Sequence, residues 1–206
     1  MIHMPPLRSK RITARLKELS ILDAIGLASI PEDMHEEAAT AFLRGAVVEA
    51  SGIADPQHWT VQERILAVCH YMASTYDDGP DFAVADKAKY SDYLLGDQQY
   101  SVPEIDIGDI EGDHWSVRHL TGVRAASIER LHGEIPGVAG RTHWRIGLMA
   151  AQMVPNGDGG PEDGDGEIDA FLLQRMRVIG GYPESVFARL LDGYTQACAK
   201  LQHLFR

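Results

Sequence analysis

The stretch Thr60-Val61-Gln62-Glu63-Arg64-Ile65-Leu66-Ala67-Val68-Cys69-His70-Tyr71-Met72 decides the fold that we predict for this chain. Thr60 and Glu63 have the spacing of a capping box, in which each side chain binds the backbone N–H of the other residue. The apolar residues after them cover much of a helix circumference, which indicates a helix in contact with several neighbours. We expect this helix to span about residues 60–75 and to stop at Asp77-Asp78-Gly79-Pro80.

Similar signals predict about seven helices in all. Ser20 and Asp23 form a second capping-box pattern, and Gly180-Gly181 is typical of a helix C-terminus. The predicted helices begin near Ser20, Pro31, Thr60, Thr121, Trp144, Ile168 and Pro183. No repeat of about 20 to 50 residues is evident in the sequence.

The helical period is lost over residues 82–120. Within this part, residues 100–107 and 115–120 are typical of short strands, and the segment 108–112 between them is typical of a turn. The sequence therefore predicts a mainly α fold, an irregular multi-helix domain with a small β-hairpin or extended insertion near residues 100–120.

The chain has 206 residues, a length that fits one domain, or one domain with a small appendage. Pro5-Pro6 disfavours regular structure at the N-terminus, so we interpret residues 1–18 as a basic arm. Residues 19–206 are then expected to form a single helical domain, which contains the insertion 82–120 and an acidic loop at 155–166.

Charge is unevenly divided along the chain. Five basic residues lie among the first nineteen, against one acid: Arg8, Lys10, Arg11, Arg15 and Lys17, with Glu18. The remainder has fourteen Lys and Arg and twenty-nine Asp and Glu, a net charge of −15. Opposite charges on two surfaces steer docking and fix its register, so we predict that these five basic residues bind a protein partner. Trp115 is predicted as a further partner contact, because tryptophans are frequent interface anchors, with a core anchor as the alternative.

The same composition argues against two other kinds of partner. A nucleic-acid-binding protein needs an extended basic footprint, and the acidic excess of this chain does not provide one. No apolar run approaches the roughly 20 residues of a membrane span, and no apolar stretch follows the basic N-terminus as in an export signal. We therefore expect no nucleic-acid partner and no membrane segment.

The acidic loop is a candidate calcium site, since the segment from Asn156 to Asp169 contains six acids. A twelve-residue calcium loop that begins at Asn156 would have Pro161 at its sixth position, where the sharp turn needs glycine. A start at Asp158 places Asp163 at that position instead. A solvated acidic loop is the simpler interpretation, and weak divalent binding is the alternative.

Other catalytic patterns are also missing from the sequence. None of the nine histidines has the His-x-x-x-His spacing of a zinc site, and there is no Gly-x-Ser-x-Gly or phosphate-loop motif. His114 and His119 are five residues apart, so a strand would place them on opposite faces. We predict no catalytic, cofactor-binding or metal-binding residues.

Two stretches resemble small tail proteins of long-tailed bacteriophages. They are Trp59-Thr60-Val61-Gln62-Glu63-Arg64 with His70-Tyr71, and His143-Trp144-Arg145-Ile146-Gly147-Leu148-Met149-Ala150-Ala151-Gln152, together with the C-terminal His203-Leu204-Phe205. The chain is thus similar to helical baseplate-hub or tail-assembly proteins that are encoded near the tape-measure gene. That family often has a late Cys-x-x-Cys segment, which this chain lacks.

The resemblance implies a non-catalytic structural subunit of a phage tail, a baseplate component that docks on tail-tube or hub proteins. Such a subunit would be present in several copies in the virion and in the host cytoplasm during assembly. A tail-assembly chaperone for the tape-measure protein is the first alternative. A small metal-dependent hydrolase that uses the acidic loop is the second alternative.

Overall fold

A computed structural model of the chain describes residues 2–77, 79, 81–94, 102–161, 167–201 and 203–205. Half of the chain is helical and 19% is strand, in three small antiparallel sheets, so the fold is mixed α/β. The mainly α class expected from the sequence is therefore wrong. The reason is that most of the strands have only two to five residues, too few to establish a clear alternation.

The chain divides into two compact units, Met1–Ser101 with Gln202–Arg206, and Val102–Leu201. The predicted domain 19–206 thus contributes to both units. Likewise, the predicted insertion 82–120 supplies short elements to the first unit and a hairpin to the second unit. The start predicted for that hairpin, residues 100–101, lies outside the described residues.

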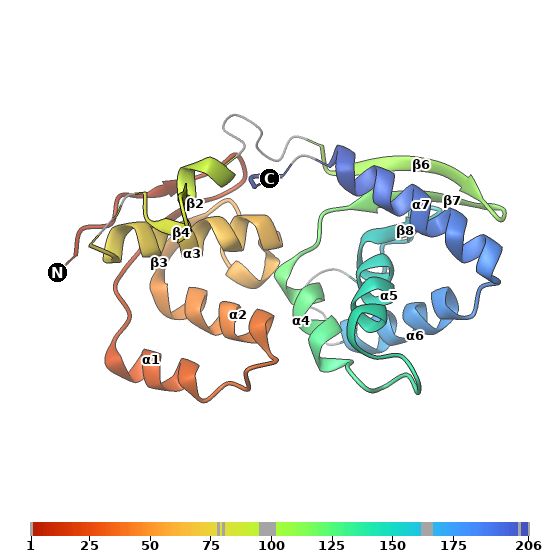
Figure 1. Cartoon of the computed structure of the whole chain (residues 1–206), viewed down its shortest axis with the longest axis horizontal. Helices are drawn as coiled ribbons and strands as arrows, with labels where there is room; N and C mark the ends of the chain where they lie inside the picture. The colour runs from red at the N-terminus through yellow and green to blue at the C-terminus, as the bar shows by residue number, and fades with distance from the viewer. Residues whose placement is uncertain are drawn as a thin grey trace. The chain divides into compact units, whose positions relative to one another are not determined.

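The first unit begins with a three-stranded sheet and three helices (Figure 1). Its elements are β1 (Leu7–Arg8), β2 (Thr13–Leu16), α1 (Ile21–Ala28), α2 (His35–Ala46), β3 (Val47–Ser51), a 3-10 turn η1 (Pro56–His58) and α3 (Val61–Thr75), followed by β4 (Ala83–Ala85), β5 (Ala88–Lys89) and η2 (Tyr90–Tyr93). The sheet has the order β1-β2-β3, and both pairings are antiparallel. β3 begins at the residue that follows α2, so no loop separates the helix from the strand.

Within residues 2–18 the chain forms β1 and β2, so the irregular arm expected over residues 1–18 does not hold there. Ile12, Ala14 and Leu16 are buried at every second position, and they place this segment in the core of the first unit. The prolines stand before β1, where they remove no hydrogen bond from the sheet.

The helix predicted from Thr60 is confirmed as α3. Thr60 Oγ1 accepts from the Glu63 backbone N–H at 3.2 Å, and the Glu63 carboxylate accepts from the Thr60 N–H at 2.9 Å. Trp59 is fully buried just before this cap, and its indole N–H donates to the Ile53 carbonyl at 2.8 Å. The capping box at Ser20 and Asp23 is confirmed in the same way at the start of α1.

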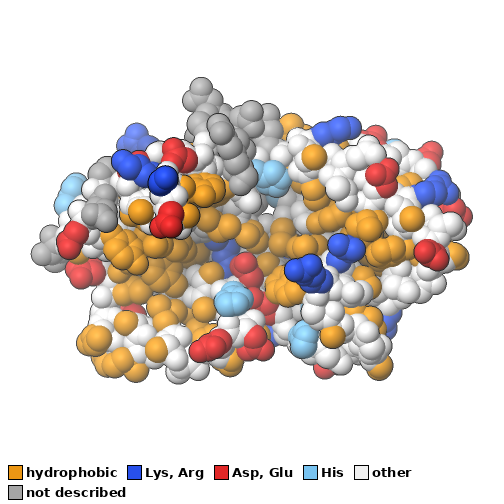
Figure 2. Space-filling model, viewed as in Figure 1, with side chains coloured by type: hydrophobic (Ala, Val, Ile, Leu, Met, Phe, Trp, Pro, Cys, Tyr) orange, Lys and Arg blue, Asp and Glu red, His pale blue; other side chains and the backbone are white. Residues whose placement is uncertain are grey.

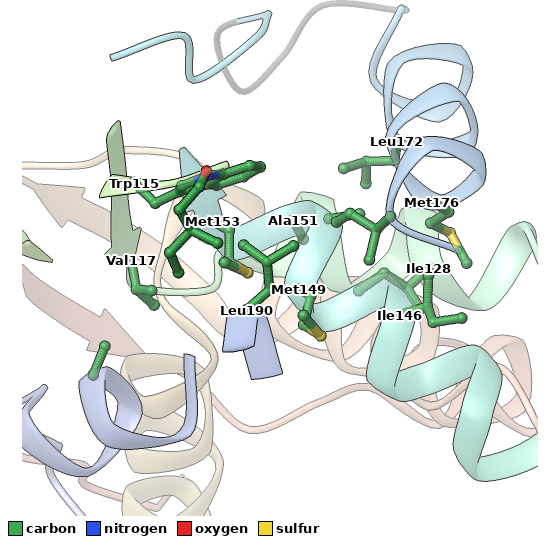
Figure 3. Close-up of a cluster of buried hydrophobic side chains, with 14 of the residues drawn as sticks. Trp115, Val117, Ile128, Ile146, Met149, Ala151, Met153, Leu172, Met176 and Leu190 are labelled. Carbon is green, nitrogen blue, oxygen red and sulfur yellow. The ribbon is translucent and has the colours of Figure 1, made fainter. Parts of the chain in front are cut away.

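The second unit contains a hairpin, a third strand and four helices. Its elements are β6 (Glu104–Ile110), β7 (Asp113–Arg118), α4 (Gly122–Arg130), α5 (Gly140–Gln152), β8 (Met153–Pro155), α6 (Ile168–Gly180) and α7 (Glu184–Lys200). The predicted hairpin is confirmed, with a tight turn at Glu111 and Gly112, both at positive φ. Figure 3 shows its core, where Trp115 and Val117 of the sheet lie with Ile128, Met149 and Leu172 of the helices.

The two units share the order of their main elements up to the helix that follows the third strand, while η1, β4, β5 and η2 belong to the first unit alone. Each begins with an antiparallel hairpin, continues with two helices, and runs without a loop from the second helix into a third strand. That strand pairs antiparallel with the second hairpin strand, β3 with β2 and β8 with β7. A further helix follows, α3 in the first unit and α6 in the second, and α7 is an addition to the second unit.

Candidate partner-binding site

The predicted basic residues lie on one sheet of the first unit. Alternation along β2 turns Ala14 and Leu16 into the core and Thr13 and Arg15 outward. Arg8 of β1 is paired with Thr13, so it lies on the same outward side. Lys10 is exposed in the turn between the two strands, and Lys17 is exposed directly after β2. We call Arg8, Lys10, Arg15 and Lys17 the basic face.

Arg11 does not belong to the basic face, because it is used within the unit. Its Nε lies 3.2 Å from a carboxylate oxygen of Glu63, whose side chain is 2% exposed. The other Glu63 oxygen accepts from the Thr60 backbone N–H, so this buried charge receives both a cation and the helix cap. We therefore assign Arg11 to holding β1 and β2 against α3, a structural role.

The basic face is only partly neutralised by carboxylates. Arg15 lies 3.7 Å from Glu49 of β3, and both side chains are 69% exposed, so water screens this pair strongly. Lys17 contributes to the lowered pKa of Asp23, after hydrogen bonds from Ser20, which are the main cause. Within the described part of the chain, no ion pair engages Arg8 or Lys10. The basic face therefore presents positive charge to solvent.

Trp115 is a core residue of the second unit. Its side chain is 4% exposed, and its indole N–H donates to the Ile110 carbonyl at 3.3 Å. The alternation of β7 points Trp115 and Val117 to the same buried face. The prediction of Trp115 as a partner contact is therefore not supported, because the ring is covered by the chain itself.

Three arginines around the acidic loop form a cluster that no pattern in the sequence indicates. Arg118 and Arg124 donate to the Gly159 carbonyl at 2.8 and 3.1 Å, and Arg124 also donates to the Pro161 carbonyl at 2.9 Å. The Arg175 guanidinium donates to the Met153 carbonyl and lies over the Phe171 ring, 5.2 Å from its centre. Burial is the main cause that lowers the pKa of Arg175 to about 10, and the positive charges of the nearby Arg118 and Arg124 contribute to the same shift.

This arginine cluster fixes the first half of the acidic loop by its backbone. A pocket of about 360 Å³ beside it is lined by Asp158, Phe171, Arg175 and Tyr182 among others. The acids Glu162, Asp163 and Asp165 lie outside the described residues. No single motif marks the three arginines, because they come from β7, α4 and α6.

A second polar group lies at the tip of the β6–β7 hairpin. His114 Nδ1 is 2.8 Å from Asp109 and its Nε2 is 3.1 Å from Asp106, all three exposed. The hydrogen bond to Asp109 is the main cause of a raised His114 pKa, and the charge of Asp106 adds to it. His119 is buried and bonds to the Val102 carbonyl at 3.1 Å, so the two histidines are on different faces as expected.

The described residues show little of the chemistry that a catalytic or metal centre would need. They contain no group of three or more His, Cys, Asp or Glu side chains that could hold a metal ion. Burial raises the pKa of the Cys69 thiol, the opposite of the shift that activates a nucleophile. The ring of the neighbouring His70 binds the Pro5 carbonyl at 2.8 Å.

The comparisons with known proteins identify no relative. No protein-family model, no curated protein and no solved structure matches the chain. Over the described residues, no helix has both the length and the apolar character needed to cross a membrane.

Proposed function

We propose that this chain is a non-catalytic structural subunit of a bacteriophage tail, a baseplate component that docks on tail-tube or hub proteins. The basic face is the observation that carries the proposal. It presents Arg8, Lys10 and Lys17 on a chain whose remainder has a net charge of −15. Such polarity favours docking between an acidic surface of a neighbour and this sheet.

The roles of the other charged residues support the same proposal. Three ion pairs each lie within a single unit: Arg11 with Glu63 and Arg64 with Glu36 in the first unit, and Arg130 with Asp169 in the second. The arginine cluster holds backbone carbonyls. These side chains serve folding, which leaves docking as the function that the exposed charges fit best.

The first test is mass spectrometry of purified phage particles that encode this chain. A structural subunit persists in the particles at a fixed copy number. A tail-assembly chaperone would be found in lysates during assembly and be absent from the particles. Absence from the particles would overturn the proposal in favour of the chaperone, or, with tight divalent binding in calorimetry, of the hydrolase.

The second test changes the charge of the basic face. Deletion of residues 1–18 would remove β1 and β2 from the sheet and unfold the unit, so charge reversal is the sharper change. Arg8→Glu with Lys10→Glu and Lys17→Glu should abolish incorporation into particles. A matched control reverses three exposed charges elsewhere, Lys87, Arg177 and Lys200, and should be incorporated normally. Normal incorporation of the first variant would exclude the basic face as the docking surface.

A further inference from the structure

Helix α1 presents an apolar face that the described residues of its own unit leave exposed. Ile21, Leu22 and Ile25 are 74%, 76% and 60% exposed, and no residue of α1 is buried. Figure 2 shows the hydrophobic side chains that gather over this helix, at the lower left. Such a patch on a folded protein marks an interaction site.

The position of α1 is nevertheless fixed. Its capping box closes the N-terminus, and the Leu19 backbone N–H donates to the Tyr71 hydroxyl of α3 at 3.1 Å. Gly45 of α2 allows close contact, since a Cβ there would lie 2.9 Å from a Leu19 methyl carbon. An isolated helix of eight residues is marginal in water, so these contacts hold α1 as a preformed ridge.

The second unit has a groove of matching character between α5 and α7. Its volume is about 580 Å³, and its walls include Trp144, Leu148, Leu191 and Tyr194. Arg141 and Arg145, one helical turn apart on α5, lie at its rim and are exposed. Neither arginine forms an ion pair with any residue that the structure describes.

We propose that α1 of one copy of this chain docks into the α5–α7 groove of a second copy. The apolar side chains of α1 would fill the groove. The exposed carboxylates that flank α1, Glu18 on one side and Glu32 and Asp33 on the other, outnumber the one exposed cation beside them, Lys17, and would meet Arg141 and Arg145 at the rim.

Charge favours this occupant over a symmetric pairing of two α1 helices. A symmetric pair would bring the acids around one α1 close to the acids around the other α1, and it would leave both groove arginines without a partner. A contact between two different surfaces is heterologous, so it repeats from copy to copy into a ring or a filament. The inference goes beyond the proposed function and stands without it, because both surfaces belong to this chain.

Sedimentation velocity of the purified full chain over a range of concentrations tests the proposal. The wild type should form dimers and larger species as concentration rises. Leu22→Asp on α1 and Arg145→Glu at the groove should each weaken association roughly tenfold or more. Both residues are exposed, so both variants should unfold in urea at the wild-type midpoint. Val84→Asp, at a 46% exposed position on β4, is the matched control and should associate like the wild type.

Mixing the two variants gives the decisive measurement. A mixture of the Leu22→Asp and Arg145→Glu proteins retains one intact α1 and one intact groove, so it should form a one-to-one dimer and nothing larger. A wild type that stays monomeric, or a mixture that stays monomeric, would overturn the proposal. So would loss of association in the α1 variant alone, the outcome expected of a symmetric α1 pair.

Discussion

In the second unit α4 buries seven of its nine residues, whereas in the first unit α1, which follows its hairpin in the same way, buries none. α4 packs against both α5 and α6, whereas among the described elements α1 has extensive contact with α2 alone. The same succession of elements thus produces a closed helix layer in one unit and an open one in the other. The difference shows that topology fixes where a helix lies, while a second helical neighbour decides whether it is covered.

The largest expected effect comes from shortening one side chain of α4, and the matching change in α1 is the comparison. Ile128 of α4 is fully buried, so Ile128→Ala should lower the free energy of unfolding by about 2–5 kcal/mol. Leu22 of α1 is 76% exposed, so Leu22→Ala should change it by less than about 0.5 kcal/mol. Urea unfolding of both variants measures the contrast, and similar losses would contradict it.

A smaller effect is expected at two glycines that allow close packing, Gly147 of α5 against α4 and Gly45 of α2 against the start of α1. A Cβ at Gly147 would lie 2.6 Å from a methyl carbon of the buried Ile128, so Gly147→Ala should cost about 1–3 kcal/mol. A Cβ at Gly45 would meet the end of the flexible Leu19 side chain at 2.9 Å. There, the gain of about 0.5–1 kcal/mol from replacing a helical glycine should offset the contact. A greater loss in urea for Gly45→Ala than for Gly147→Ala would reverse the comparison.

A still smaller effect is expected from removing the hydroxyl at the N-cap of the first helix in each unit. Ser20 accepts from the Asp23 backbone N–H at 3.1 Å, so Ser20→Ala should reduce the protection of α1 amides by about 0.5–1 kcal/mol in hydrogen exchange. Thr121 stands at the N-cap position of α4, but its hydroxyl makes no capping hydrogen bond. That hydroxyl is buried and has no hydrogen-bond partner among the described residues. Thr121→Val should leave α4 protection unchanged or slightly higher. Equal losses in the two helices would show that both hydroxyls act as caps.

The smallest effect concerns pH and the second hairpin. The His114 pKa is raised above its ordinary 6.5 because Asp109 accepts a hydrogen bond from the charged ring. A raised pKa means that the interaction is complete below about pH 6.5 and is lost as pH rises through the folded value. An NMR titration of His114 should show a midpoint above 6.5, and Asp109→Asn should lower it. An unchanged midpoint in that variant would show that Asp109 is not the cause.

The sequence predicted the helices that carry their own boundary signals. The capping boxes of Thr60 with Glu63 and of Ser20 with Asp23 join residues three positions apart. They therefore depend on the local sequence and not on the rest of the fold. The β6–β7 hairpin was also visible, because glycines bracket its turn. The first sheet was missed although Ile12, Ala14 and Leu16 alternate, since the polar residues between them gave the impression of a solvated basic arm.

The candidate site was harder to predict than the helices. The basic residues were identified, but nothing in the spacing of Arg11 and Glu63 indicates that fifty-two positions apart they form a buried ion pair. A tryptophan such as Trp115 suits an interface anchor and a core residue equally well. Only the packing of the sheet decides between these two roles. The arginine cluster depends on three separate elements and requires the fold to be known.

The direct passage from α2 into β3, and from α5 into β8, has a mechanical consequence. No loop joins α5 to β8, so one extra residue in α5 would have one of two effects. It would either rotate the part of α5 before the inserted residue by about 100° about the helix axis, or shift β8 along β7 by one position. The first outcome would rotate Met149 and Ala150 out of the interior, and the second would exchange the two sides of β8. Natural variation in length should therefore avoid these two junctions and accumulate in the segments after each third strand.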